Sequence, residues 1–104
     1  MIIDFANLGM PVFTGRDRGQ KARQDLGLDK LPIDEIVRVI IPEDTYAVTS
    51  SFFLGLFGAS VRELGGEGFE KKFQFEGPAF ICGKVPDWIM RALRDKRDIF
   101  GRAP

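Results

Sequence analysis

Three consecutive hydroxyl residues, Thr49, Ser50 and Ser51, stand directly before a hydrophobic stretch of the chain. This pattern is typical of a helix N-terminus, and we expect a serine oxygen to accept a hydrogen bond from a free backbone N–H group of the first turn. The same N–H groups and the positive end of the helix dipole also tolerate a phosphate. The cluster therefore has two interpretations: Ser50 and Ser51 are phosphoacceptor candidates, or the cluster is a helix cap and nothing more.

Phe52 follows the serines, and we expect its ring to be exposed beside them. An exposed aromatic next to a helix start marks a protein contact surface, so Thr49 and Phe52 are the predicted partner-binding residues. The alternative is that Phe52 joins the core, as we expect for most of the ten phenylalanines of the chain.

A second candidate site is the turn Gly15-Arg16-Asp17-Arg18-Gly19. Glycines that flank arginines at a helix start can hold an anion, because backbone N–H groups and the guanidinium groups of Arg16 and Arg18 converge on it. The turn lacks the Lys-Ser/Thr pair of a P-loop and the spacing of a dinucleotide-binding fingerprint. The alternative is that these residues, Gly15 and Gly19 included, form a solvated turn at the start of a surface helix and bind no anion.

The composition narrows the chemistry. The chain has 104 residues, no histidine and one cysteine, Cys82. These counts predict a single domain over residues 1–104, with no imidazole acid–base catalysis, no disulfide, no metal site and no cofactor. Cys82 lies in an apolar run and is expected to be a buried small hydrophobic residue.

Charge and hydropathy limit the kinds of partner that this chain is expected to bind. Fifteen basic and fifteen acidic side chains cancel, which argues against a nucleic-acid or membrane partner held by bulk charge. No apolar run reaches the length of a membrane span, and no leader pattern opens the chain. We therefore expect a cytoplasmic protein, with the basic stretch around Arg91 as a solvated helix face.

The expected secondary structure alternates between strands and helices. The run Ile36–Ile41 is β-branched and nearly continuous, which predicts an interior strand covered on both faces. Other expected strands are Met1–Phe5, the half-exposed Phe69–Glu76 and a short run, Ala79–Cys82. Expected helices run from Thr14 to Leu26 with Gly27 as the stop, from Phe52 to Leu64 with Gly65-Gly66 as the end, and from Pro86 onward with Asp87 as the cap. This alternation predicts an α/β fold: a mixed, largely parallel sheet with helices packed mainly on one face.

Two of the expected helices have informative faces. Gly19, Ala22 and Leu26 share one thin apolar side, which would let the first helix lie close to the sheet. The helix over residues 52–64 has two apolar stripes and therefore needs two neighbours. A homodimer that buries the second stripe is one way to supply the other neighbour.

An ordered set of segments over residues 13–76 resembles a known family. The set comprises Gly15-Arg16 with Gly19 and Arg23, the run Ile36 to Ile41, Ser50-Ser51-Phe52 with Leu56-Phe57-Gly58, and Leu64-Gly65. It is similar to the STAS fold of sulfate-transporter tails and anti-sigma-factor antagonists, and closer to bacterial STAS-like domains of unknown function. The resemblance implies a STAS-like domain over the whole chain.

The antagonist branch implies a switch at the start of the serine-bearing helix. In that branch a serine there is phosphorylated by a partner kinase, and phosphorylation releases the partner. By position the resemblance implies Ser50 first and Ser51 second, with a histidine-kinase-type ATPase, an anti-sigma-like kinase, as the partner. The antagonists have an aspartate where this chain has Thr49 and a glycine where it has Phe52. A kinase that recognises the aspartate-serine-serine-glycine turn of the antagonists therefore meets a different sequence at Thr49–Phe52 of this chain. With no membrane segment, the transporter-tail role does not transfer.

The expected function is therefore a non-catalytic regulatory module. It docks a protein partner through the start of the helix at Ser50, and serine phosphorylation is a secondary hypothesis. The alternative is a nucleotide- or phosphate-binding domain that uses Gly15, Arg16, Arg18 and Gly19. An enzyme ranks third, because the chain has no histidine and one cysteine.

Overall fold

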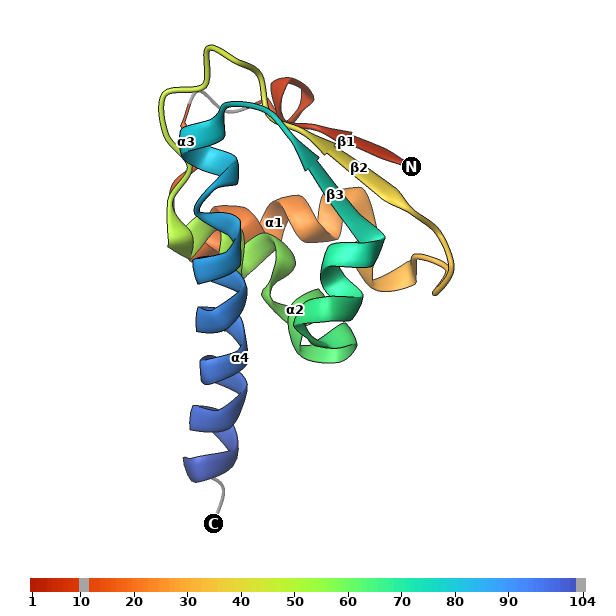
Figure 1. Cartoon of the computed structure of the whole chain (residues 1–104), viewed down its shortest axis with the longest axis vertical. Helices are drawn as coiled ribbons and strands as arrows, with labels where there is room; N and C mark the ends of the chain where they lie inside the picture. The colour runs from red at the N-terminus through yellow and green to blue at the C-terminus, as the bar shows by residue number, and fades with distance from the viewer. Residues whose placement is uncertain (10–11, 103–104) are drawn as a thin grey trace.

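The computed structural model describes residues 1–9 and 12–102, and the side chains through residue 94. The described part of the chain alternates strands and helices, as expected for an α/β domain (Figure 1). In order, its elements are β1 (Ile2–Asp4), the 3₁₀ turn η1 (Phe5–Asn7), α1 (Arg16–Leu26), the 3₁₀ turn η2 (Leu28–Lys30), β2 (Val37–Ile40), α2 (Ser50–Lys72), β3 (Phe73–Glu76), α3 (Ala79–Cys82) and α4 (Val85–Arg102).

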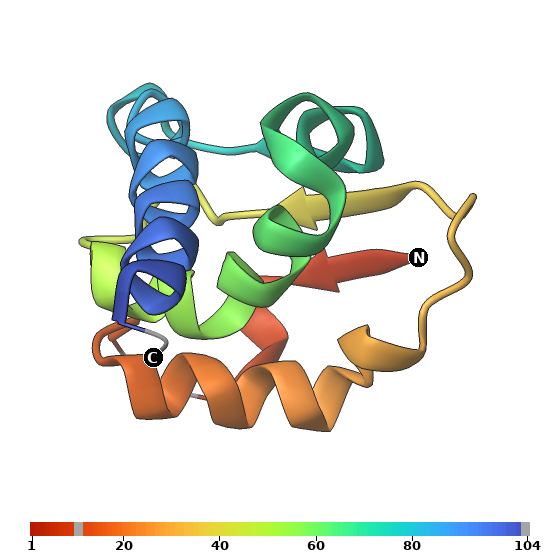
Figure 2. The same ribbon diagram turned by 90° about the horizontal axis from the view of Figure 1, so that it is seen from below.

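The sheet has the order β1-β2-β3, and all three of the described strands are parallel. Helices α1 and α2 lie below the sheet in Figure 1, and Figure 2 views the molecule from that side. Residues on the helix side, such as Val37 and Val39, are fully buried, whereas Arg38 between them is exposed. The expectation that Ile36–Ile41 is covered on both faces is therefore wrong, because a single layer of helices covers only one face.

Helix α1 packs against α2 through glycines rather than against the sheet. A Cβ atom on Gly19 would overlap the backbone oxygen of Phe52 and lie 2.8 Å from the nitrogen of Leu56. A Cβ on Gly55 would likewise overlap the backbone oxygen of Arg16. The small face of α1 is thus confirmed as a close-packing face, but its neighbour is α2. As expected, α1 ends at Gly27, whose φ of 68° is left-handed.

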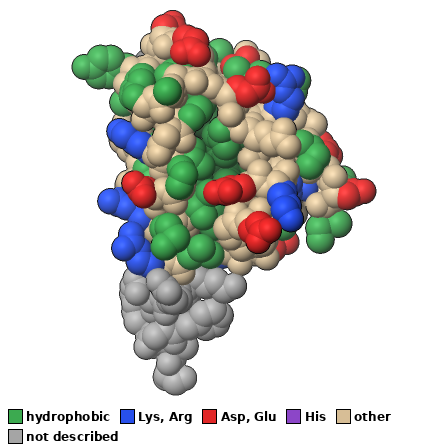
Figure 3. Space-filling view, in the orientation of Figure 1, with side chains coloured by type: hydrophobic (Ala, Val, Ile, Leu, Met, Phe, Trp, Pro, Cys, Tyr) green, Lys and Arg blue, Asp and Glu red, His purple; other side chains and the backbone are tan. Residues whose placement is uncertain are grey.

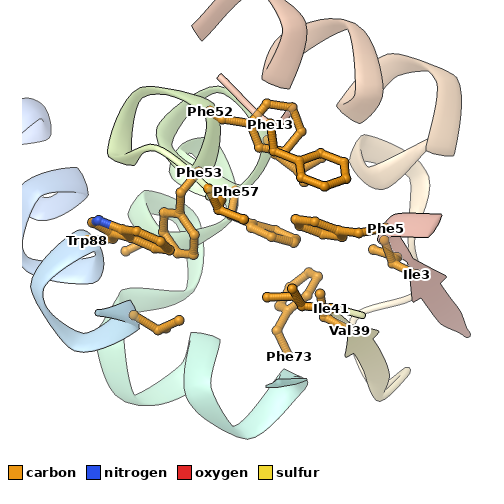
Figure 4. Close-up of a cluster of buried hydrophobic side chains, with 14 of the residues drawn as sticks. Ile3, Phe5, Phe13, Val39, Ile41, Phe52, Phe53, Phe57, Phe73 and Trp88 are labelled. Atoms are coloured by element: carbon orange, nitrogen blue, oxygen red, sulfur yellow. The ribbon is translucent and has the colours of Figure 1, made fainter. Parts of the chain in front are cut away.

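The phenylalanine-rich helix α2 is buried on both of its apolar stripes (Figure 4). Phe57 lies among phenylalanine rings of α2 and β3, with ring centroids 5.3–5.7 Å apart. On the other stripe, Phe52 and Leu56 are fully buried inside the chain. The second neighbour of α2 is therefore supplied by its own domain, and this stripe is not available to a second copy.

The second half of the chain departs from the expected secondary structure in several places. Gly65 breaks α2 with φ 77° and ψ 166°, as expected, but the chain resumes a helix and continues to Lys72. Strand β3 therefore begins only at Phe73. The run Ala79–Cys82 is a single helical turn instead of a strand, because Cys82 N and Gly83 N donate to Pro78 O and Ala79 O. Helix α4 begins at Val85, so Asp87 lies inside its first turn and is not the cap.

Two buried cations hold the segment after α1 against α2. The guanidinium of Arg23 donates to the backbone oxygen of Leu56 and the hydroxyl of Ser60, both at 2.9 Å, and to Asp29 at 2.7–2.9 Å. The ammonium of Lys72 donates to three backbone oxygens between residues 32 and 35, at 2.6–3.3 Å. Burying these charges is tolerable because all three guanidinium nitrogens of Arg23 and the ammonium nitrogen of Lys72 donate hydrogen bonds. This network orients the chain that leads into β2.

Candidate functional site

The start of α2 is built by Thr49, which is the N-cap residue. Its hydroxyl oxygen accepts a hydrogen bond from the backbone N–H of Phe52 at 3.2 Å. Its own backbone N–H donates to the oxygen of Phe13 at 2.9 Å, and the pair Phe13–Val48 forms a parallel bridge. A hydroxyl cap was expected here, but the capping oxygen belongs to the threonine and not to a serine. Both serines are consequently released from capping.

Ser50 and Ser51 are the first two residues of α2 and point to different surroundings. The hydroxyl oxygen of Ser50 accepts a hydrogen bond from a guanidinium nitrogen of Arg91 at 3.0 Å. Ser51 is exposed. Arg91 belongs to α4 and lies 41 positions after Ser50 in the sequence. Tertiary structure therefore gives Ser50 a basic neighbour.

Ser50 lies at the edge of an open hollow between the start of α2 and the start of α4. We call this the α2–α4 hollow; its volume is about 520 Å³. Its wall is formed by the loop before α2 on one side and by one face of α4 on the other. The lining residues are Ala47, Val48, Thr49, Ser50, Lys84, Asp87, Trp88 and Arg91.

Three hollow residues of the α4 side were not identified as site residues from the sequence. Lys84, Trp88 and Arg91 recur at the spacing of one helix face, which is a signal present in the sequence. That spacing does not say which other segment the face meets. Their assignment to the site required the packing of α4 beside α2.

Phe52 is not an exposed contact residue, so this prediction is wrong. Its exposed fraction is 0%, and its ring lies 5.6 Å from that of Phe13 and 5.9 Å from that of Phe5 (Figure 4). The bridge between Phe13 and Val48 brings the first loop of the chain over the start of α2 and covers the ring. Of the two predicted partner-binding residues, Thr49 lines the hollow, whereas Phe52 belongs to the hydrophobic core.

The residues of the turn over 15–19 have different surroundings in the structure. Gly15 is the N-cap of α1 with φ 88° and offers no side-chain cap, while Arg16 and Arg18 are exposed. Gly19 is buried and serves the contact with α2. In open parallel sheets, ligands bind where helices diverge to opposite faces of the sheet. A sheet of order β1-β2-β3 with its helices on one side has no such point, so the fold adds no support for an anion site here.

Metal and membrane features were also sought in the described part of the chain. It holds no group of three or more His, Cys, Asp or Glu side chains placed to bind a metal ion. None of its helices is long and apolar enough to cross a membrane.

Cys82 lies in α3 and is half-buried, less enclosed than expected. Burial raises the pKa of its thiol, and the negative charge of Glu43 raises this pKa further. At neutral pH the thiol is therefore protonated and poorly nucleophilic.

We expect iodoacetamide to alkylate Cys82 in the folded protein more slowly than it alkylates free cysteine at neutral pH. The rate should rise with pH and reach its midpoint above the ordinary thiol pKa. Mass spectrometry of the intact protein across a pH series measures this rate, with the urea-unfolded protein as the control. Equal rates for the folded and unfolded protein would contradict the raised pKa.

Known proteins offer no relative for this chain: no family model, no curated protein and no solved structure matches it. A functional assignment therefore depends on the residues of the chain itself. These are the threonine-capped start of α2, the hollow beside it and the charged side chains that line the hollow.

Proposed function

We propose that this chain is a non-catalytic regulatory domain of the STAS-like type that docks a protein partner at the start of α2. The observation that carries the proposal is the α2–α4 hollow, which opens at Thr49 and Ser50. Its lining combines hydroxyl groups, an indole and charged groups of both signs. Such a mixture is common at the rim of protein interfaces. The proposed compartment is the cytoplasm, which suits a chain with one unpaired cysteine.

Phosphorylation of Ser50 is the proposed switch. The hydroxyl is released from capping by Thr49 and hydrogen-bonded to Arg91 at 3.0 Å. A phosphate on Ser50 would meet this guanidinium and the N–H groups of the first turn of α2. Those charge-assisted contacts would fill part of the docking surface with the chain's own phosphate. The proposed kinase is a partner ATPase of the histidine-kinase type, as the STAS-like resemblance implies.

The variant Ser50→Asp is expected to weaken partner binding about tenfold, a loss of about 1.4 kcal/mol. A carboxylate at this position can pair with Arg91 and occupy the surface that the partner uses. Ser50→Ala is expected to bind the partner like wild type, because it adds no charge. The partner is first captured with tagged protein from its native cells and identified by mass spectrometry, and affinities are then measured by titration calorimetry.

Ser51→Asp is the matched control. It adds the same charge one residue later, at an exposed position for which no described side chain supplies a hydrogen bond. It should change affinity less than Ser50→Asp does. If Ser50→Asp and Ser50→Ala both bind like wild type, charge at Ser50 is not the switch. If native-cell purification yields the protein alone, the docking function itself is overturned.

A further inference from the structure

The α2–α4 hollow carries an excess of positive charge. Lys84 and Arg91 line it together with a single carboxylate, that of Asp87. Both cations are exposed, and neither forms an ion pair with a carboxylate of the described residues. Lys and Arg side chains gather along the edge of the molecule where α4 lies (Figure 3). A chain with zero net charge therefore presents a locally basic docking surface.

We propose that the hollow binds an acidic segment of the partner protein, with Asp or Glu side chains that pair with Lys84 and Arg91. This inference rests on the proposed docking function and names the chemistry of its partner. The spacing supports it, because Lys84 directly precedes α4 and Arg91 lies seven residues later on that helix, so the two cations are about two helical turns apart. Two cations so placed match carboxylates spread along an extended segment better than one small anion.

Trp88 strengthens the case for a peptide. Its side chain lines the hollow between the two cations but is only 6% exposed, so it forms an apolar floor and not a protruding contact. An apolar floor between charged walls accommodates the aliphatic stems of glutamate side chains. Nucleic acid fits this surface less well. A nucleic acid needs many cations along its phosphate backbone, whereas this hollow has only two among its lining residues, Lys84 and Arg91, together with the carboxylate of Asp87.

The same geometry explains how a modification would compete with the partner. Arg91 already donates to the Ser50 hydroxyl at 3.0 Å, so a phosphate on Ser50 would hold the guanidinium that the acidic segment needs. Both would seek the same cation. Phosphorylation and partner binding would then exclude each other.

The direct test uses an acetylated hexaglutamate peptide as the probe. Trp88 is the only tryptophan of the chain, so its fluorescence reports on the hollow without a label. We expect a saturable fluorescence change with hexaglutamate that weakens with added salt, and no saturable change with hexalysine. Equal binding of both peptides would overturn the inference, as would tighter binding of a single-stranded oligonucleotide.

Charge variants locate the binding surface. Lys84→Gln and Arg91→Gln are each expected to weaken hexaglutamate binding about two- to fivefold, as for exposed charge pairs. Asp87→Asn should strengthen it, since it removes the opposing carboxylate. These three positions are exposed, so circular dichroism is expected to show the wild-type fold.

Arg18→Gln and Lys30→Gln are the matched controls. Each removes one exposed positive charge outside the hollow and should leave the affinity unchanged. A loss at Arg18 equal to that at Arg91 would move the site to the turn at residues 15–19 and overturn the inference. Binding that ignores both Lys84→Gln and Arg91→Gln would overturn it as well.

The inference and the proposed function can fail separately. If the captured partner binds wild type and both Lys84→Gln and Arg91→Gln with equal affinity, the docking function stands and the acidic segment is ruled out. If hexaglutamate binds the hollow as expected but the protein purifies alone from its native cells, the basic surface stands and the docking function falls.

Discussion

Gly55→Ala is expected to destabilise the protein by about 3 kcal/mol, near the upper end of what overpacking costs. The added Cβ would overlap the backbone oxygen of Arg16 and lie 2.9 Å from the backbone nitrogen of Gln20. Backbone atoms cannot rotate away as a flexible side chain can, so α1 and α2 must move apart. For a domain of this size, that loss lowers the melting temperature by about 12–24 °C.

Gly58→Ala is the matched control for this substitution. It lies three residues further along the same helix, where the three atoms nearest the new Cβ all belong to the guanidinium end of Arg62, at 3.1 Å or more. That end can shift, and alanine is a better helix former than glycine by about 1 kcal/mol. The control should therefore be neutral or slightly stabilising in thermal and urea unfolding. If the two variants unfold alike, α1 and α2 do not pack backbone to backbone at Gly55.

Phe57→Ala is expected to cost about 3–5 kcal/mol of unfolding free energy. The ring is fully buried and lies within 5.7 Å, centroid to centroid, of the rings of Phe53, Phe69, Phe73 and Phe75. Its removal leaves a cavity where α2 meets β3. Since domains are stable by about 5–15 kcal/mol, this single change removes a large part of the total.

Phe80→Ala is the control for the loss of a phenylalanine as such. Phe80 lies on α3 and is 56% exposed, so its removal should change stability by no more than about 0.5 kcal/mol. Urea unfolding followed by circular dichroism measures both variants. An unfolding free energy for Phe57→Ala within 1 kcal/mol of the Phe80→Ala value would show that Phe57 is not central to the core.

Several features of the fold were predictable because they depend on neighbours close in the sequence. The β-branched run at Ile36–Ile41 forms β2, and Gly27 ends α1, as expected. A hydroxyl residue caps α2, although it is Thr49. One local pattern gave a wrong prediction, the strand from Phe69, because Phe69 and Phe73 fit the spacing of both a strand and a helix face. In the structure they stack at 4.7 Å, with the helix ending between them.

The candidate site divides in the same way. The hydroxyl cluster at Thr49 and Ser50 was identified from the residues alone, since helix caps are local. The exposure of Phe52 was mispredicted, because its cover comes from Phe5 and Phe13, almost forty residues or more away in sequence. No local pattern encodes which loop will fold over a helix start.

The sequence by itself determined that this chain is one α/β domain without histidine chemistry, and it located the start of the helix that carries the site. Only the tertiary structure decided that Arg91 meets Ser50, that Lys84 and Trp88 complete the hollow, and that Arg38 on the outer face of the sheet is exposed. The physical reason is the range of the interactions. Caps, stops and periodicity act within a few residues, whereas a docking surface depends on where separate helices come to rest against a shared core.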